Sequence, residues 1–136
     1  MGDSNQSIIQ AINLGQYRQA QVLIQKKIKK FPSKSYYHAL NCLCLLKSGK
    51  QPEAITEATQ LKSKTPSDPD TLLTLADIFN EVGDHASALQ VYENAVKKYP
   101  SHDLIYQWFR GALNRGDIRT LQKATMSLQK VKKSLQ

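Results

Sequence analysis

The stretch that decides the fold is Gly83-Asp84-His85-Ala86-Ser87-Ala88-Leu89-Gln90-Val91-Tyr92-Glu93-Asn94-Ala95-Val96-Lys97-Lys98-Tyr99-Pro100. Gly83 suits a tight turn between two helices, because it has no Cβ to oppose a left-handed backbone. Ala88, Tyr92 and Ala95 recur at helical spacing and therefore share one face. Two lysines follow where a helix dipole favours cations, and the closing proline ends the helix. The stretch predicts a turn followed by one amphipathic helix.

The same pattern recurs along the chain at a nearly constant interval. The turn glycines lie 34, 34 and 33 residues apart, and a small residue and a proline repeat every 34 residues. The markers are Gly15, Gly49, Gly83 and Gly116, then Ala20, Ala54 and Ala88 with Leu121 in the fourth position, then Pro32, Pro66 and Pro100. A 34-residue period with these markers is typical of tetratricopeptide repeats, which the chain resembles over nearly all of its length. The resemblance implies an all-α, right-handed superhelical solenoid of about four helix pairs.

We expect one solenoid domain over residues 1–136, with repeats at roughly 1–34, 35–68, 69–102 and 103–136. The first helix is expected from about Asn5 to Leu14, and the second repeat opens near Ser35. Asp68 or Asp70 caps the third repeat, Ser101 or Asp103 begins the fourth, and the last helix runs from Thr120 to about Lys133.

The last predicted helix raises the question of what covers its apolar side. Leu121, Leu128 and Val131 share one face and have no following helix in this sequence. Either the chain self-associates there, or it is the N-terminal part of a longer helical-repeat protein. We favour the second interpretation.

Composition and cysteine usage limit the class of protein. Apolar residues make up 40% of the 136 residues, and no apolar run approaches the length that spans a membrane. Cys42 and Cys44, the only cysteines, point to different sides of a helix and do not form the usual metal or redox pair. We expect buried thiols in a reducing compartment, a cytoplasmic location and no membrane partner.

The sequence offers no arrangement typical of catalysis. His38, His85 and His102 have no spacing that converges on a metal or a nucleophile, and there is no Gly-rich phosphate loop. A solvated or hydrogen-bonding role explains each histidine. We therefore expect no enzyme activity, no cofactor, no metal and no small-molecule substrate.

Recognition of a protein partner is the function that remains. Tetratricopeptide stacks present their first helices on a concave surface that holds a peptide or a partner helix. By repeat position, the partner-binding groove is expected to include Tyr36, Leu43, Asp77, Asn80, Tyr106, Arg110 and Asn114. Ordinary packing between repeats explains Tyr36 and Leu43 equally well. The basic clamp for acidic chaperone tails is absent, because its positions hold Asn5, Ile9, Leu40, Asp70 and Thr74.

The formal net charge is +8, and lysines gather at the predicted helix ends, at 26–30, 97–98 and 130–133. Cations at these positions complement helix C-termini and keep the surface soluble. The alternative is attraction to an anionic surface such as ribosomal RNA. We favour the structural role for each cluster singly, and together they leave ribosome contact open.

A closer resemblance rests on four stretches. Gly49-Lys50-Gln51-Pro52-Glu53-Ala54, Tyr92 to Pro100, the lysines before Phe31-Pro32, and Tyr106-Gln107-Trp108-Phe109 resemble the N-terminal repeats of the auxiliary subunit of the N-terminal acetyltransferase B (NatB) complex. The resemblance implies a scaffold that wraps a separate catalytic acetyltransferase subunit and helps place it at the ribosome. That catalytic partner acetylates nascent chains beginning Met-Asp, Met-Glu, Met-Asn or Met-Gln. The alternatives are a generic tetratricopeptide adaptor and an RNA- or ribosome-binding module.

Overall fold

The computed structural model describes residues 3–134, which contain eight helices and no strand. The helices are α1 (Asp3–Asn13), α2 (Tyr17–Lys30), α3 (Ser35–Lys47), α4 (Gln51–Ser63), α5 (Pro69–Glu81), α6 (His85–Lys98), α7 (His102–Arg115) and α8 (Ile118–Ser134). Met1, Gly2, Leu135 and Gln136 lie outside the described part. The bounds of the first and last helices differ from the expected ones by one or two residues.

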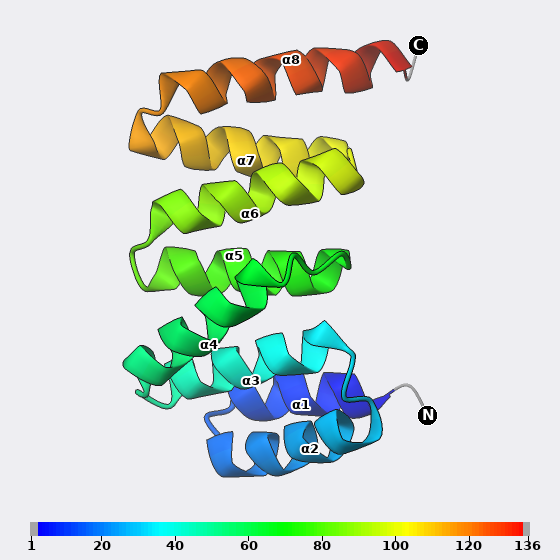
Figure 1. The fold of residues 1–136 in the computed structure, drawn as a ribbon, viewed down its shortest axis with the longest axis vertical. Coiled ribbons are helices and arrows are strands. Elements are labelled where there is room, and N and C mark those ends of the chain that lie inside the picture. Colours follow the sequence, from blue (N-terminus) through cyan, green and yellow to red (C-terminus); the bar gives the residue numbers. More distant parts are fainter. Residues whose placement is uncertain (1–2, 135–136) are drawn as a thin grey trace.

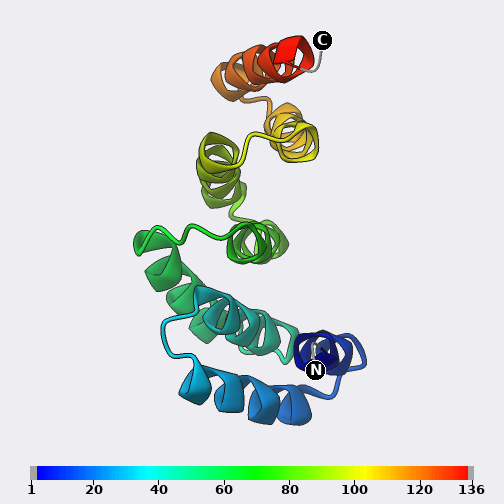
Figure 2. The ribbon, with the colours of Figure 1, turned by 90° about the vertical axis from the view of Figure 1, so that its right-hand side faces the viewer.

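The helices stack as antiparallel neighbours along one axis, so that the two ends of the chain lie at opposite ends of the stack (Figure 1). Each helix packs mainly on its neighbours in sequence, and α3 also packs on α1 and α5. Turned by 90°, the stack follows a curved path from α1 to α8 (Figure 2). The prediction of an all-α solenoid built from four helix pairs is confirmed.

The four repeating glycines form equivalent turns. Their φ angles are +78°, +90°, +86° and +70°, values that side chains with a Cβ rarely adopt. After each glycine, the next backbone N–H donates to the carbonyl five residues earlier at 2.8–2.9 Å, which satisfies a free carbonyl of the preceding helix. These bonds join Gln16 to Ala11, Lys50 to Leu45, Asp84 to Phe79 and Asp117 to Ala112.

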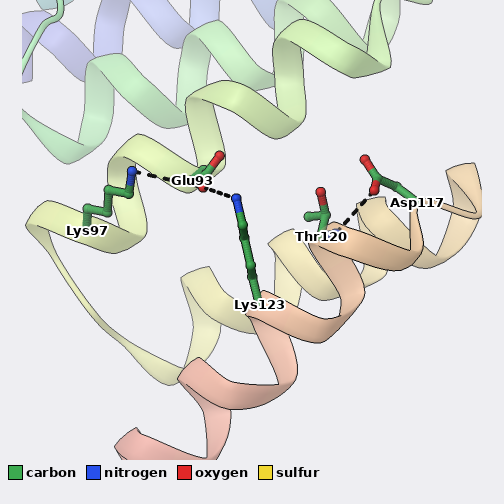
Figure 3. Close-up of polar contacts among 5 residues, drawn as sticks. All are labelled: Glu93, Lys97, Asp117, Thr120 and Lys123. Atoms are coloured by element: carbon green, nitrogen blue, oxygen red, sulfur yellow. Dashed lines mark hydrogen bonds and ion pairs between the residues drawn. The ribbon is translucent and has the colours of Figure 1, made fainter.

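The later helices begin at side-chain caps. Asp68 accepts from the backbone N–H of Thr71 at 3.0 Å, and Ser101 Oγ accepts from that of Leu104 at 3.2 Å. The structure thus selects Asp68 from the two expected caps of the third repeat and Ser101 from the two expected starts of the fourth. Asp84 and Asp117 cap α6 and α8 in the same way, the latter through Thr120 N at 3.1 Å (Figure 3). The first residues of α2, α3 and α4 have no side-chain cap.

The core consists of two apolar clusters that meet at α3. The smaller cluster joins α1, α2 and the near face of α3, and the larger one extends from α3 to α8. Cys44 belongs to the smaller cluster and Cys42 to the larger, so the two buried thiols point to different sides as predicted. Ala20, Ala54 and Ala88 are at most 1% exposed, because their small side chains let the paired helices approach closely.

The last helix pair packs differently from the others. Whereas α5 packs directly on α3, α7 packs mainly on α6 and α8. The contact with α6 is close at Gly111, where a Cβ would lie 2.9 Å from Leu89 Cδ2. In Figure 2, α6 accordingly lies between α5 and α7 along the stack.

The apolar face of α8 is covered in part by α7. Leu121, Leu128 and Val131, for which the sequence provides no following helix, are half-buried against the larger core cluster. This stripe packs in part on the preceding helices, and within residues 3–134 no later helix covers the part that stays exposed. The exposed apolar side chains of α8 are Ile118 (69% exposed) and Met126 (62%).

Candidate functional site

The seven predicted groove residues lie on the first helices of three successive pairs. Tyr36 and Leu43 belong to α3, Asp77 and Asn80 to α5, and the last three to α7. The structure brings Asn80, Arg110 and Asn114 together around one cavity and places the other four elsewhere.

This cavity, which we call the arginine cleft, lies between α5, α6 and α7 and has a volume of about 500 Å³. It is lined by Asn80, His85, Leu89, Tyr92, Gln107, Arg110, Gly111, Asn114 and Arg115. Sequence reasoning missed the contributions of α6 and of Gln107 and Arg115. Repeat position alone carried no signal for them, because the cleft arises where α7 packs on α6.

Polar groups of the cleft are held by contacts within the repeat. His85 Nδ1 lies 2.9 Å from Asn80 Oδ1. Because an amide oxygen only accepts, the imidazole Nδ1 donates this bond, and the Asn80 amide hydrogens stay available. The predicted hydrogen-bonding role of His85 is confirmed, and the residue also lines the cleft.

The two arginines of the cleft have no ion pair among residues 3–134. Arg115 contributes to a lowered pKa of Asp84, but the largest cause of that lowering is the Ser87 hydroxyl, which donates to the Asp84 carboxylate at 2.7 Å. That carboxylate also accepts the Ser87 backbone N–H, and it does not line the cleft. The cleft therefore carries positive charge that no neighbouring carboxylate neutralises through direct contact.

Asp77 belongs to the preceding junction, between α3 and α5. Lys47 Nζ on α3 and Glu81 Oε1 on α5 form an ion pair of 2.6 Å there. The pKa of Asp77 is raised, mainly by desolvation and then by the Glu81 carboxylate, whereas Lys47 lowers it. Asp77 thus interacts with the α3–α5 ion pair and does not line the arginine cleft.

Tyr36 and Leu43 take part in packing between repeats, the alternative that the sequence left open. Leu43 is half-buried and packs against both core clusters. Tyr36 is also half-buried, lines a separate cavity together with Asn5 and Asp70, and has a pKa raised first by burial and then by Asp70. Tyr106 is 49% exposed on α7 and lies outside the arginine cleft.

A second charged surface, the Phe31 lysine cluster, surrounds the end of α2. The ammonium groups of Lys27, Lys30 and Lys34 lie 5.8, 5.4 and 5.1 Å from the centre of the Phe31 ring. Each distance is within range of a cation–π interaction. None of these lysines forms an ion pair in the described part of the chain. The sequence predicted a lysine cluster here but not its arrangement around one ring.

The lysine cluster at the end of α6 has partners, in contrast. Lys97 Nζ lies 4.0 Å from Glu93 Oε1, which Lys123 of α8 approaches to 3.3 Å (Figure 3). Lys98 Nζ donates to the Pro66 carbonyl at 3.3 Å. These contacts support the structural interpretation of this cluster. In the lysine cluster at 130–133, the side chain of Lys133 is not among the side chains that the structure describes.

A family model described as the Psidin N-terminal TPR repeats region matches residues 5–136. The chain belongs to this family. Within residues 3–134, no helix has the length and apolar character needed to cross a membrane, and no group of three or more His, Cys, Asp and Glu side chains is placed to hold a metal ion.

Two relatives of this chain are named as subunits of an acetyltransferase complex. The N-terminal acetyltransferase B complex subunit MDM20 of Saccharomyces cerevisiae is 29% identical over 92% of this chain and 16% of its own length. N-alpha-acetyltransferase 25, NatB auxiliary subunit, of Homo sapiens is 30% identical over 78% of this chain and 11% of its own length. The chain therefore spans less than a fifth of each of these two relatives.

Solved structures share the fold at low sequence identity. A chain of the structure of Naa15/Naa10 bound to HypK-THB superposes with a TM-score of 0.77 at 16% sequence identity. The superposition covers 97% of this chain and 20% of that chain. The MamA RS-1 ArsTM double mutant gives a TM-score of 0.63 at 17% identity, with 97% of this chain and 75% of that chain covered. The similarity to both establishes the helical-repeat fold.

Proposed function

We propose that this chain is a non-catalytic scaffold segment of a NatB auxiliary subunit. In this role it supports a separate catalytic acetyltransferase subunit in the cytoplasm and helps to place it at the ribosome for co-translational N-terminal acetylation. The observation that carries the proposal is the alignment of nearly the whole chain with MDM20, a NatB complex subunit, within a family matched over residues 5–136.

The geometry is compatible with a scaffold. A solenoid exposes the edges of its helices along its whole length, so that a partner can lie across several repeats. Most of the exposed side chains on α5 and α7 are polar or charged, as at Asp77 and Arg110, and α7 also exposes Leu113 (56%) and Tyr106 (49%). Such a surface suits a protein partner that brings complementary polar groups.

Affinity capture tests the proposal. The tagged chain, alone and within its native gene product, is recovered from a cytosolic extract and its partners are identified by mass spectrometry. Recovery of an acetyltransferase supports the scaffold role, and capture with the chain alone shows that these repeats take part. Recovery of other proteins without an acetyltransferase from either bait favours the alternative, a generic tetratricopeptide adaptor.

A second candidate function is contact with ribosomal RNA through the Phe31 lysine cluster. It is favoured by three unpaired ammonium groups around one ring, a density of positive charge that attracts phosphates. This contact would serve the ribosome placement that the scaffold proposal includes, and it is tested separately through its dependence on salt.

A further inference from the structure

We propose that the arginine cleft binds an acidic peptide segment of another protein, with Arg110 and Arg115 holding its carboxylates. This inference goes beyond the scaffold role, because it does not depend on which complex the chain joins. The first observation is the charge of the cleft. Both arginines line the cleft, and neither has an ion pair among the described residues. A guanidinium group presents a planar set of donors that fits a carboxylate through two parallel hydrogen bonds.

The Asp84 carboxylate acts on Arg115 electrostatically but does not pair with it. Asp84 lies outside the cleft and has no ion pair among the described residues, and its oxygens accept from the Ser87 hydroxyl at 2.7 Å and the Ser87 backbone N–H at 3.2 Å. At the preceding junction, Lys47 has its counter-ion in Glu81. Among the described residues the α5–α7 junction has no equivalent ion pair, so the two guanidinium groups are available to carboxylates of another molecule.

The remaining lining groups suit a peptide backbone. Asn80, Gln107 and Asn114 carry amides, each of which both donates and accepts, as an extended peptide requires. Leu89 and Tyr92 add apolar surface at the base of the cleft, where Gly111 lets α7 approach α6. The volume of about 500 Å³ accommodates a few residues of such a segment.

A peptide explains these features better than RNA does. Single-stranded RNA is held by aromatic rings on which bases stack, together with cations that follow the backbone. Two rings line the cleft: Tyr92 is only 6% exposed, and the imidazole of His85 is held by its hydrogen bond to Asn80 Oδ1. The denser group of cations, the Phe31 lysine cluster, lies in the first half of the chain, at the end of α2.

The test is fluorescence anisotropy with labelled Gly-Asp-Glu-Asp-Glu-Gly, compared with the neutral peptide Gly-Asn-Gln-Asn-Gln-Gly at physiological salt. The double variant Arg110→Gln/Arg115→Gln is expected to bind the acidic peptide at least about tenfold more weakly, because it loses two charge-assisted contacts. Lys26→Gln/Lys29→Gln removes the same net charge from exposed positions on α2 and is expected to bind within about twofold of the parent chain.

Circular dichroism checks that each variant keeps its helical content. If the double variant unfolds, Arg110→Lys takes its place; it keeps the charge, loses the planar donor set and is expected to bind several-fold more weakly. Equal losses in the arginine and lysine variants would overturn the proposal. Equal binding of the neutral peptide, binding of neither peptide, or displacement of the acidic peptide by an equimolar uridine hexanucleotide would do so as well.

Discussion

Lys47 Nζ on α3 lies 2.6 Å from Glu81 Oε1 on α5, and this ion pair joins the first helices of the second and third helix pairs. In the described part of the chain, no ion pair joins α5 to α7. An ion pair therefore joins the first helices at the α3–α5 junction, whereas the arginine cleft lies at the α5–α7 junction. This difference between neighbouring junctions organises the candidate binding surface.

The Lys47–Glu81 pair should contribute little to stability. The two side chains are 40% and 46% exposed, and exposed pairs contribute about 0.2–1 kcal/mol. A double-mutant cycle with Lys47→Ala and Glu81→Ala, followed by urea unfolding, should give a coupling energy in that range that falls in about 1 M salt. A coupling well above it, insensitive to salt, would show that water is excluded from the pair.

Asp77 and Asp84 should affect the pH dependence of stability in opposite directions. The raised pKa of Asp77 means that its ionised form is disfavoured in the folded state, so Asp77→Asn should stabilise the chain near neutral pH. The lowered pKa of Asp84 means that its carboxylate stabilises the folded state, and Asp84→Asn should destabilise the chain there. The difference at Asp77 should be lost as the pH falls to about 4, because its raised pKa protonates it early, whereas the difference at Asp84 should shrink only below about pH 4, because its pKa is lowered. Thermal unfolding at several pH values measures them, and effects of the same sign would contradict the assignment.

Close packing between the paired helices should depend on Ala88. This residue is 1% exposed, so Ala88→Leu forces extra volume between α5 and α6 and should cost about 1–3 kcal/mol or more of unfolding free energy. Ala86→Leu is the matched control, because Ala86 lies exposed on the same helix. Its effect should stay within about 0.5 kcal/mol in urea unfolding. Similar costs for both variants would mean that α6 does not approach α5 at Ala88.

The Phe31 lysine cluster should bind RNA in a salt-dependent way. Filter binding of a ribosomal RNA fragment should weaken steeply between about 50 and 200 mM salt, because binding releases counterions from phosphates. The triple variant Lys27→Gln/Lys30→Gln/Lys34→Gln should reduce the slope of log affinity against log salt by about 2–3 relative to the parent. An RNA affinity that does not change with salt, or an unchanged slope in the variant, would rule out RNA binding at this cluster.

The sequence predicted those features that depend on local chemistry. The turn glycines can be recognised in the sequence because only a residue without Cβ adopts their positive φ at low cost. The buried alanines recur because each helix pair needs the same close approach. Asp68 was an expected cap and Ser101 an expected repeat start for a similar reason, since each side chain can satisfy a free N–H three residues away.

What the sequence did not predict depends on contacts between distant residues. α7 packs on α6 with Gly111 close to Leu89, and this packing places Arg110 with His85 and Arg115 around one cleft. Repeat position placed Asp77 and Arg110 in one groove, although Asp77 interacts with Lys47 and Glu81 on the α3–α5 side. The convergence of three lysines on Phe31 likewise depends on how α2 and α3 meet.

The central claim is that the chain supports a NatB-type acetyltransferase, and acetyl transfer by the captured complex tests it most directly. Complexes recovered with the tagged native gene product are given labelled acetyl-CoA and a peptide that begins Met-Asp, with a peptide that begins Met-Lys as the matched control. The account predicts label on the Met-Asp peptide at a level clearly above the control, and loss of that activity when residues 1–136 are deleted from the bait. Capture of partners that transfer no acetyl group to the Met-Asp peptide, or undiminished activity after the deletion, would contradict it.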